Sequence, residues 1–232
     1  MILLSKVMNE KHKLYLLPGL DGSGDFFAKI YPYLSNEIKT EILPYGNQYY
    51  KYDKIFNFYK NKLKEENIYL LAESFGGPLA YKFSQLHNVK KIIFSASFIS
   101  CPYRYTGHLK LLNSLILSHH IPNPFLGLFL ANSLNPFNNK CQKIIKLNLS
   151  LPPKTIQKRI FEVLTLPEPT YRISQPVLYL KAKQDRLISY YAPNIIKKFS
   201  NNFYTQGFNS SHLLLEECPQ EASHAILKFI KS

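Results

Sequence analysis

The sequence predicts an α/β protein whose central sheet is mostly parallel and flanked by helices, with a helical segment inserted in the middle of the chain. Three observations lead to this class. Short apolar runs alternate with amphipathic helical stretches over residues 13–96. One apolar run passes into a helix across only two residues, 73 and 74. From residue 101 to residue 170 the alternation stops, because this stretch is rich in proline and contains no convincing strand.

Length and composition predict one domain with a full hydrophobic core, since the chain has 232 residues and 46% of them are hydrophobic. We expect residues 1–100 and 173–232 to form the two parts of the core, with residues 101–172 as a helical cap. No run approaches the ~20 apolar residues of a membrane-spanning helix. The apolar stretch at the N-terminus is too short for a signal peptide.

The cysteines and the net charge limit the classes of protein further. Cys101, Cys141 and Cys218 are odd in number and lack metal-ligand spacing, which argues against a disulfide framework and a zinc site and favours a cytoplasmic location. The net charge of +14 is compatible with a nucleic acid, a membrane surface or an acidic carrier as partner. No basic run or nucleic-acid-binding motif supports the first of these, so we expect no nucleic acid.

The first expected strand, residues 13–17, runs directly into the loop 18–24, which contains three glycines. Such a loop lets the backbone approach a ligand closely. It does not match the glycine patterns of nucleotide-phosphate loops. Asp21 is expected to fix the loop through local hydrogen bonds. A helix over 25–34, a strand over 40–43 and a helix over 52–64 are expected to follow.

The stretch 68–87 is the most informative part of the chain. Residues 68–72 form an unbroken apolar run, which is typical of a strand buried on both faces. A helix is expected from Phe75 onward, so Ser74 stands at a sharp bend with the small residues Ala72 and Gly76 on either side. This small-x-Ser-x-Gly pattern is that of a nucleophile elbow. A serine that merely caps the helix is the alternative.

Beyond the elbow the pattern predicts strands over 90–96, 176–180 and 202–205, and helices over 195–199 and 219–230. Asp185 follows the second of these strands, where α/β folds place functional residues. The alternative is an ordinary loop aspartate. His212 lies in a loop, directly after two serines and before an apolar stretch. It could be a functional histidine, and the alternative is a merely exposed one. The stretch 101–170 carries eight basic and two acidic residues, which fits either a solvated surface or an acidic partner.

The loop 18–24, the Ser74 elbow, Asp185 and His212 occur in an order that resembles the α/β-hydrolase superfamily over essentially the whole chain. The resemblance implies an α/β-hydrolase fold with Ser74 as nucleophile, His212 as general base and Asp185 as the acid that orients the histidine. It implies that the backbone N–H groups of Leu20 and Phe75 form the oxyanion hole. It implies no cofactor and no metal. The usual first strand pair would be absent or reduced to residues 2–7.

Within the superfamily, the chain is similar to small capped carboxylesterases of the pimeloyl-[acyl-carrier-protein] methyl ester esterase type, which serve biotin synthesis. That resemblance implies a small acyl-ester substrate and an acidic acyl carrier protein as partner. The expected docking residues in the cap are Lys143, Lys146, Lys158 and Arg159. The elbow of the best-known members reads Gly-Trp-Ser-Leu-Gly, whereas this chain has Glu73 before the serine. An acyl thioesterase, a lipase-like enzyme and a non-catalytic hydrolase-fold binding protein are the other hypotheses.

Overall fold

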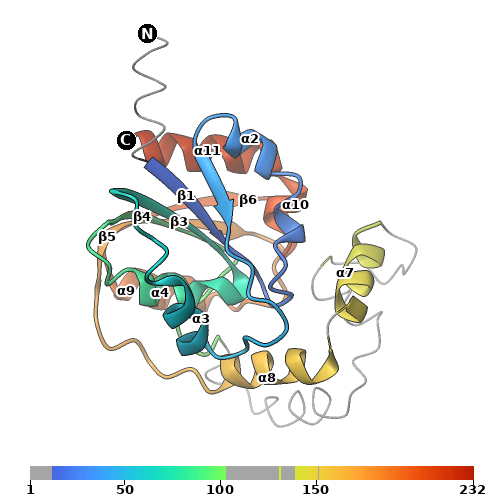
Figure 1. The fold of residues 1–232 in the computed structure, drawn as a ribbon. Coiled ribbons are helices and arrows are strands. Elements are labelled where there is room, and N and C mark those ends of the chain that lie inside the picture. The colour runs from blue at the N-terminus through green and yellow to red at the C-terminus, as the bar shows by residue number, and fades with distance from the viewer. Residues whose placement is uncertain (1–11, 103–130, 132–138, 151) are drawn as a thin grey trace.

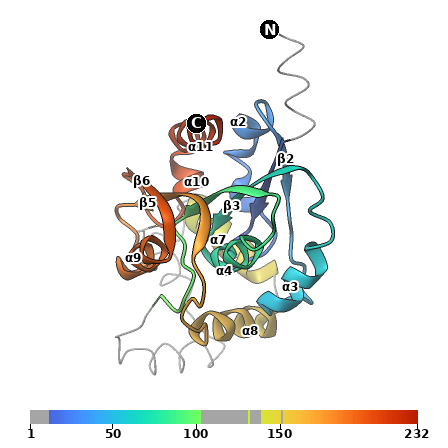
Figure 2. The same cartoon turned by 90° about the vertical axis from the view of Figure 1, so that its left-hand side faces the viewer.

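The computed structural model describes residues 12–102, 131, 139–150 and 152–232, and they contain a six-stranded sheet covered by helices on both faces (Figures 1 and 2). The strands are β1 (His12–Leu17), β2 (Lys39–Ile42), β3 (Asn67–Glu73), β4 (Val89–Ser95), β5 (Ile173–Ala182) and β6 (Ser200–Phe208). Their order in the sheet is β2-β1-β3-β4-β5-β6, and every neighbouring pair is parallel. The predicted α/β class, with a parallel central sheet flanked by helices, is confirmed.

The central strands are apolar throughout because both faces of the sheet are covered. In β1, Leu14 and Leu16 point to one face and Tyr15 and Leu17 to the other, and all four are buried. Leu17 lies opposite Ala72 of β3 in the sheet, so β1 and β3 end side by side at the carboxyl edge. This edge therefore receives both the loop 18–24 and the residues that follow β3.

Two hydrophobic cores fill the two faces of the sheet. One face carries helices that pack through Ile55, Leu79 and Ile195, and the other carries helices that pack through Leu34 and Ile226. The helices of the first face are α3 (Tyr52–Tyr59), α4 (Gly77–Phe83) and α9 (Tyr191–Lys198). Those of the second face are α2 (Tyr31–Ser35), α10 (Leu214–Glu217) and α11 (Pro219–Lys231), and Figure 1 shows the two groups on opposite sides of the strands.

The expected helix over residues 25–34 is instead a 3₁₀ helix, η1 (Asp25–Phe27), followed by the short α2. Pro32 explains the division, because proline has no N–H group and is tolerated only in the first turn of a helix. In the structure Pro32 lies in the first turn of α2. The expected helix over 52–64 ends earlier, at Tyr59.

The segment 101–172 connects β4 to β5, and its described part contains α7 (Asn139–Ser150) and α8 (Pro153–Leu164) and no strand. Both views place α8 beside α3 (Figures 1 and 2). Two hydrogen bonds join α8 to the rest of the fold. The Thr155 hydroxyl donates to Asn47 O at 3.0 Å, and Tyr52 N of α3 donates to Glu162 at 3.3 Å. The expected short strand over residues 2–7 lies outside the described residues, as does most of 103–138.

Two further findings concern the described residues. None of their helices is both long enough and apolar enough to cross a membrane. All three cysteines, Cys101, Cys141 and Cys218, are free thiols.

Candidate active site

Ser74 stands between β3 and α4, at the first position of the 3₁₀ helix η2 (Ser74–Gly76), and its φ is +45°. A non-glycine residue rarely adopts this left-handed region, and it persists only where the surroundings enforce it. Two close approaches enforce it here. A Cβ on Gly76 would lie 2.5 Å from Leu17 O, and a Cβ on Gly77 would lie 2.2 Å from Phe98 O. Both positions therefore require glycine, and the bend packs between the end of β1 and the stretch that follows β4.

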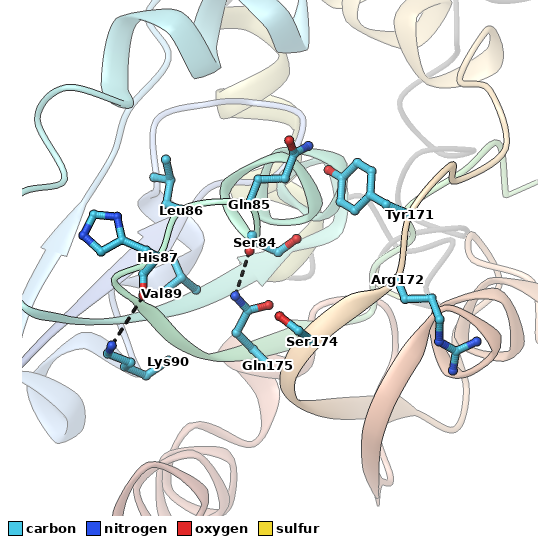
Figure 3. Close-up of a pocket in the computed structure, with 10 residues that line it drawn as sticks. All are labelled: Ser84, Gln85, Leu86, His87, Val89, Lys90, Tyr171, Arg172, Ser174 and Gln175. Atoms are coloured by element: carbon cyan, nitrogen blue, oxygen red, sulfur yellow. Dashed lines mark hydrogen bonds between the residues drawn. The ribbon is translucent and has the colours of Figure 1, made fainter.

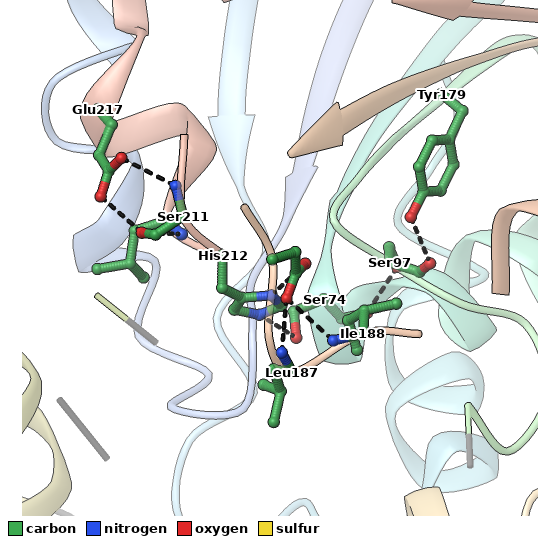
Figure 4. Close-up of polar contacts among 10 residues, drawn as sticks. Ser74, Ser97, Tyr179, Leu187, Ile188, Ser211, His212 and Glu217 are labelled. Atoms are coloured by element: carbon green, nitrogen blue, oxygen red, sulfur yellow. Dashed lines mark hydrogen bonds and ion pairs between the residues drawn. The ribbon is translucent and has the colours of Figure 1, made fainter. Parts of the chain in front are cut away.

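The structure brings the three predicted catalytic side chains together. The Ser74 Oγ lies 3.0 Å from His212 Nε2 (Figure 4). The other ring nitrogen, His212 Nδ1, lies 2.9 Å from Asp185 Oδ2. The His212 side chain is 4% exposed and that of Asp185 is 8% exposed. The remaining Asp185 oxygen, Oδ1, accepts hydrogen bonds from the backbone N–H groups of Leu187 and Ile188 at 2.8 and 2.9 Å. These distances allow a proton to pass from serine to histidine.

Burial and charge act in opposite directions on the two titratable groups. Burial of the imidazole would lower the pKa of His212, but the adjacent Asp185 carboxylate outweighs this effect and raises it above the ordinary value. Burial would raise the pKa of Asp185, but His212 and the two backbone N–H groups lower it. The pair therefore favours an ionised aspartate beside a histidine of increased basicity.

The loop 18–24 lies against the nucleophile, since a Cβ placed on Gly19 would be 3.8 Å from Ser74 Cβ. Asp21 fixes the loop locally, because its carboxylate accepts hydrogen bonds from the backbone N–H and the hydroxyl of Ser23. Tyr45 adds a third restraint by donating its hydroxyl to Pro18 O at 3.0 Å. Leu20 is thus on a restrained loop beside Ser74. Phe75 directly follows Ser74 in η2. Their roles as oxyanion donors remain predictions.

Arg159 is not a docking residue, and this prediction is wrong. Its side chain is 0% exposed and points from α8 into the core, so no partner protein can reach it. The guanidinium donates to the backbone carbonyls of Leu20 and Asp21, each at 2.8 Å, and to those of Gly46 and Tyr49. A planar guanidinium has five donors and suits several acceptors at once. Arg159 therefore joins α8 to the loop beside Ser74.

The three lysines predicted to dock a carrier differ in their surroundings. Lys143 of α7 forms an ion pair with Glu216 of α10 at 2.7 Å. Lys158 is exposed, with its ammonium 4.4 Å from the centre of the Tyr50 ring. The Lys146 side chain lies outside the described residues. A second ion pair, Lys140 to Glu217 at 2.8 Å, joins the same two helices. These two pairs tie α7 to the helix that begins just after His212.

Sequence reasoning missed three features of this site: the role of Arg159, the burial of Glu73, and the ion pairs that Glu216 and Glu217 form. Glu216 and Glu217, two adjacent acidic residues shortly after His212, could have indicated ion pairs with the basic segment 101–172. Glu73 differed from the resembling family, but nothing in the sequence indicated its environment. No three histidine, cysteine or carboxylate side chains of the described residues gather so that they could hold a metal ion.

A pocket of about 470 Å³ lies elsewhere, at the amino ends of β4 and β5 (Figure 3). Ser84, Lys90, Arg172 and Gln175 are among the residues that line it. Ser74, by contrast, follows the carboxyl end of β3, which is the edge where parallel α/β sheets bind ligands. The Figure 3 pocket is therefore separate from the Ser74 site, and Arg172 there already donates to Asn201 and to two backbone carbonyls.

Comparison with solved structures supports the fold. The chain is similar to a lipase-esterase related protein from Clostridium acetobutylicum (18% identity, TM-score 0.79, 95% of each chain covered). It is also similar to a hydrolase from Oleispira antarctica (13% identity, TM-score 0.81, 96% of this chain and 92% of that chain). A third such structure is an esterase from Exiguobacterium antarcticum (17% identity, TM-score 0.77, 97% and 93%).

No protein-family model and no curated protein sequence matches the chain. The identities to the solved structures are low, so the likeness establishes an α/β-hydrolase fold and no more than the fold. Function has to be argued from the site.

Proposed function

We propose that this protein hydrolyses carboxylic esters through Ser74, His212 and Asp185, with an acyl-enzyme intermediate. The observation that carries the proposal is the continuous hydrogen-bonded chain from Ser74 Oγ through both ring nitrogens of His212 to Asp185, at 3.0 and 2.9 Å. The names of the similar structures, which include an esterase and a lipase-esterase related protein, agree with it.

In the first half-reaction, Ser74 Oγ attacks the ester carbonyl carbon while His212 Nε2 takes the hydroxyl proton. The negative charge moves to the carbonyl oxygen, where the N–H groups of Leu20 and Phe75 would stabilise it. The carbon–oxygen bond to the alcohol then breaks, and His212 returns the proton to the departing alcohol. Ser74 is left as an acyl ester.

In the second half-reaction, water replaces the alcohol. His212 takes a proton from water, the hydroxide attacks the acyl carbon, and the proton returns to Ser74 Oγ as the acid leaves. Asp185 holds the imidazole with Nδ1 protonated and stabilises its charged form throughout. Its own orientation is fixed by the N–H groups of Leu187 and Ile188.

A fluorophosphonate probe tests the nucleophile directly. We expect the native protein and a Ser210→Ala control to be labelled, and Ser74→Ala to be neither labelled nor active. Ser210 is a suitable control because, unlike Ser74, its hydroxyl is buried and has no hydrogen-bond partner among the described residues, so its removal should affect neither labelling nor turnover. Labelling or ester turnover that persists at the native level in Ser74→Ala would overturn the mechanism. Loss of both in Ser210→Ala would show that labelling reports the integrity of the fold instead.

The main alternative within this mechanism is a thiol as leaving group in place of an alcohol, because the same three residues can cleave an acyl thioester. Matched acyl esters and acyl thioesters of equal chain length distinguish an esterase from a thioesterase. A lipase-like enzyme would prefer the longest chains. A binding protein would cleave none of them and would leave the fluorophosphonate unreacted.

A narrower form of the proposal is a methyl esterase that acts on an acyl chain delivered by an acidic acyl carrier protein, as in biotin synthesis. Its support is the net charge of +14 and the excess of basic residues in the segment 101–172, which we propose to be a cap over the site. Arg159 is buried, so it cannot contact a carrier protein and does not support this narrower proposal. The exposed lysines of α8, Lys154 and Lys158, are the described residues that remain available.

A further inference from the structure

The residue before the nucleophile, Glu73, carries a buried carboxyl group, and one of its two oxygens lacks a partner among the described residues. The side chain is 4% exposed, and its Oε2 has no hydrogen-bond partner among the described residues. Buried polar groups are nearly always hydrogen-bonded, because leaving one unpaired costs free energy. A carboxyl group in this state requires an explanation beyond packing.

The unpaired oxygen lies beside Ser74 and the loop 18–24. A Cβ placed on Gly19 would be 3.7 Å from Glu73 Oε2, 3.8 Å from Ser74 Cβ and 3.6 Å from Asp21 Oδ1. These are ordinary contact distances, so the missing side chain of Gly19 leaves methyl-sized room where the three residues meet. The free oxygen of Glu73 therefore lies next to the nucleophile and next to the loop that is predicted to hold the substrate carbonyl.

The surrounding charges decide the protonation of Glu73. Burial is the main effect and raises the pKa of the carboxyl to about 8. Asp21 on the loop and Glu216 on α10 act in the same direction, while His212 and Lys143 of α7 oppose it. At neutral pH the group is therefore a carboxylic acid, which has an O–H to donate.

We propose that Glu73 forms a subsite that donates a hydrogen bond to an uncharged oxygen of the substrate, such as an ether, hydroxyl or carbonyl oxygen next to the scissile ester. The proposal deepens the proposed hydrolase function and rests on it. It gives the buried carboxyl its missing partner, and it narrows the substrate class to esters with a second polar oxygen close to the reacting carbonyl.

Two pairs of isosteric esters test the subsite. On the acyl side, a methoxyacetate ester differs from the butyrate ester only in an ether oxygen that replaces a methylene. On the alcohol side, a 2-methoxyethyl ester differs in the same way from a butyl ester. The measured quantity is kcat/KM for the ester with the ether oxygen divided by kcat/KM for its alkyl counterpart. This ratio is compared between the native protein and two variants. Comparison across variants cancels the intrinsic reactivity of the esters.

We expect Glu73→Leu, which has no donor, to lower the ratio for one pair by about 3- to 10-fold, the usual range for one neutral hydrogen bond. The pair that responds identifies the side of the ester that Glu73 contacts. The matched variant Glu73→Gln keeps a neutral donor and should keep most of the preference. An unchanged ratio for both pairs in Glu73→Leu, or an equal loss in Glu73→Gln, would overturn the proposal.

The dependence on pH separates a donor from a mere space-filling role. In the native protein the ether preference should decline as the pH rises through about 8, because a carboxylate cannot donate. In Glu73→Gln the preference should stay constant over the same range, because an amide does not titrate. A preference that stays constant in the native protein would show that Glu73 is not the donor.

Infrared spectroscopy on the Ser74→Ala background gives a readout that does not need turnover. The stretching band of a protonated carboxyl should be present at neutral pH, should be absent from Ser74→Ala/Glu73→Gln, and should shift when the methoxy ester binds. Absence of the band would overturn the protonated donor even if the native protein were active. A band that shifts on binding in Ser74→Ala, together with a native protein that hydrolyses neither ester, would overturn the proposed function but not the hydrogen bond from Glu73.

Discussion

At the scale of single residues, the Ser74 site depends on burial as much as on distance. His212 and Asp185 are almost completely buried, so each has exchanged water for a small number of fixed partners. In such surroundings a neighbouring charge has a larger effect on a pKa than it would have in water. The Asp185 carboxylate therefore sets the basicity of His212, and the pH dependence of turnover should report it.

We expect kcat/KM of the native protein to rise with pH along a limb above the ordinary histidine pKa of about 6.5, because His212 must be unprotonated to accept the serine proton. Asp185→Asn removes the charge that raises this pKa and leaves the opposing effect of burial. The limb should therefore move to lower pH, and the plateau should fall by about 10⁴-fold, as for the same substitution in serine proteases. A full pH–rate profile measures both changes.

The two parts of this prediction fail separately. A limb that does not move in Asp185→Asn would mean that another group controls turnover. A plateau close to the native one would mean that a different carboxylate orients His212. Glu217→Gln is the matched control, because Glu217 also lies near the His212 loop but bonds to Ser211 and Lys140 instead.

At the scale of secondary-structure elements, two helices of the segment 101–172 reach the site by different means. α8 uses the buried Arg159, whose donors are divided between the loop beside Ser74 and the stretch that contains Gly46. α7 uses ion pairs to α10. The first connection consists of buried hydrogen bonds and the second of partly exposed charges, so their removal should have effects of different size.

Arg159→Met should lower kcat by about 10²-fold with a smaller change in KM, because the loop that carries Leu20 loses its anchor and an oxyanion donor is worth about that much. It should also lower the free energy of unfolding by about 3 kcal/mol, since several carbonyls lose their donor. Arg159→Lys should recover only part of either loss, because an ammonium cannot reach four carbonyls. Steady-state kinetics and denaturant unfolding measure the two effects.

The neighbouring variant Lys158→Met is the control for Arg159→Met, since that side chain is on the same helix but exposed. It should change neither kcat nor stability appreciably. If both variants lose activity equally, the whole helix matters and Arg159 has no special position. If Arg159→Met unfolds more easily but keeps its kcat, Arg159 is structural only.

Lys143→Ala should destabilise the protein by about 1 kcal/mol, and Lys140→Ala by less. The order follows from burial. Glu216, the partner of Lys143, is 7% exposed, and of the described residues only Lys29, at 3.4 Å, would still pair with it. Glu217 is 13% exposed and keeps its bonds to Ser211. Thermal unfolding at low and high salt measures this. Both differences should shrink in salt, and differences independent of salt would show that the pairs are not electrostatic ties.

At the scale of the whole molecule, the distribution of charge bears on how a substrate arrives. The net charge of +14 acts at long range, and part of its excess belongs to the segment 101–172, whose helix α8 contacts the loop beside Ser74. Exposed charges act on encounter and contribute little individually, so a group of them has to be changed to see an effect. Arg159 has to be left intact in such a test, because its removal would damage the fold.

If an acidic carrier delivers the substrate, Lys154→Glu/Lys158→Glu on α8 should lower kcat/KM for a carrier-linked acyl ester by about 10-fold and should leave a small neutral ester unaffected. Raising the salt concentration should produce the same loss in the native protein. Lys228→Glu/Lys231→Glu on α11, on the opposite side of the sheet from α8 (Figure 1), is the control with equal charge change.

Each outcome of this comparison is informative. An equal loss with both pairs of substitutions would show a general effect of net charge without a docking surface. An equal loss on carrier-linked and small esters would show that α8 had been damaged. No loss on the carrier-linked ester would remove the carrier hypothesis and leave the esterase proposal unchanged.

Local patterns in the sequence were enough to predict most of the strands and helices and the order of the chemical groups along the chain. Apolar runs and helical spacing are local patterns, so they predicted the strands around Leu17 and Ala72 and the helix after Phe75. The Ser74 elbow could be read because its sharp turn restricts the residues on either side, Ala72 and Gly76, to small ones. Asp185 and His212 could be proposed because functional residues follow the carboxyl ends of parallel strands.

The exposure of each side chain and the identity of its partners became known from the folded chain, because both depend on residues that are distant in sequence. Arg159 reads as one more cap cation in the sequence, yet its acceptor Leu20 O lies 139 positions away and no local pattern encodes that contact. The ion pair between Lys143 and Glu216 spans 73 positions. The protonation of Glu73 likewise depends on burial and on charges from the loop 18–24, α7 and α10. Burial and long-range electrostatics are properties of the assembled fold, and they distinguish a docking cation from a buried anchor.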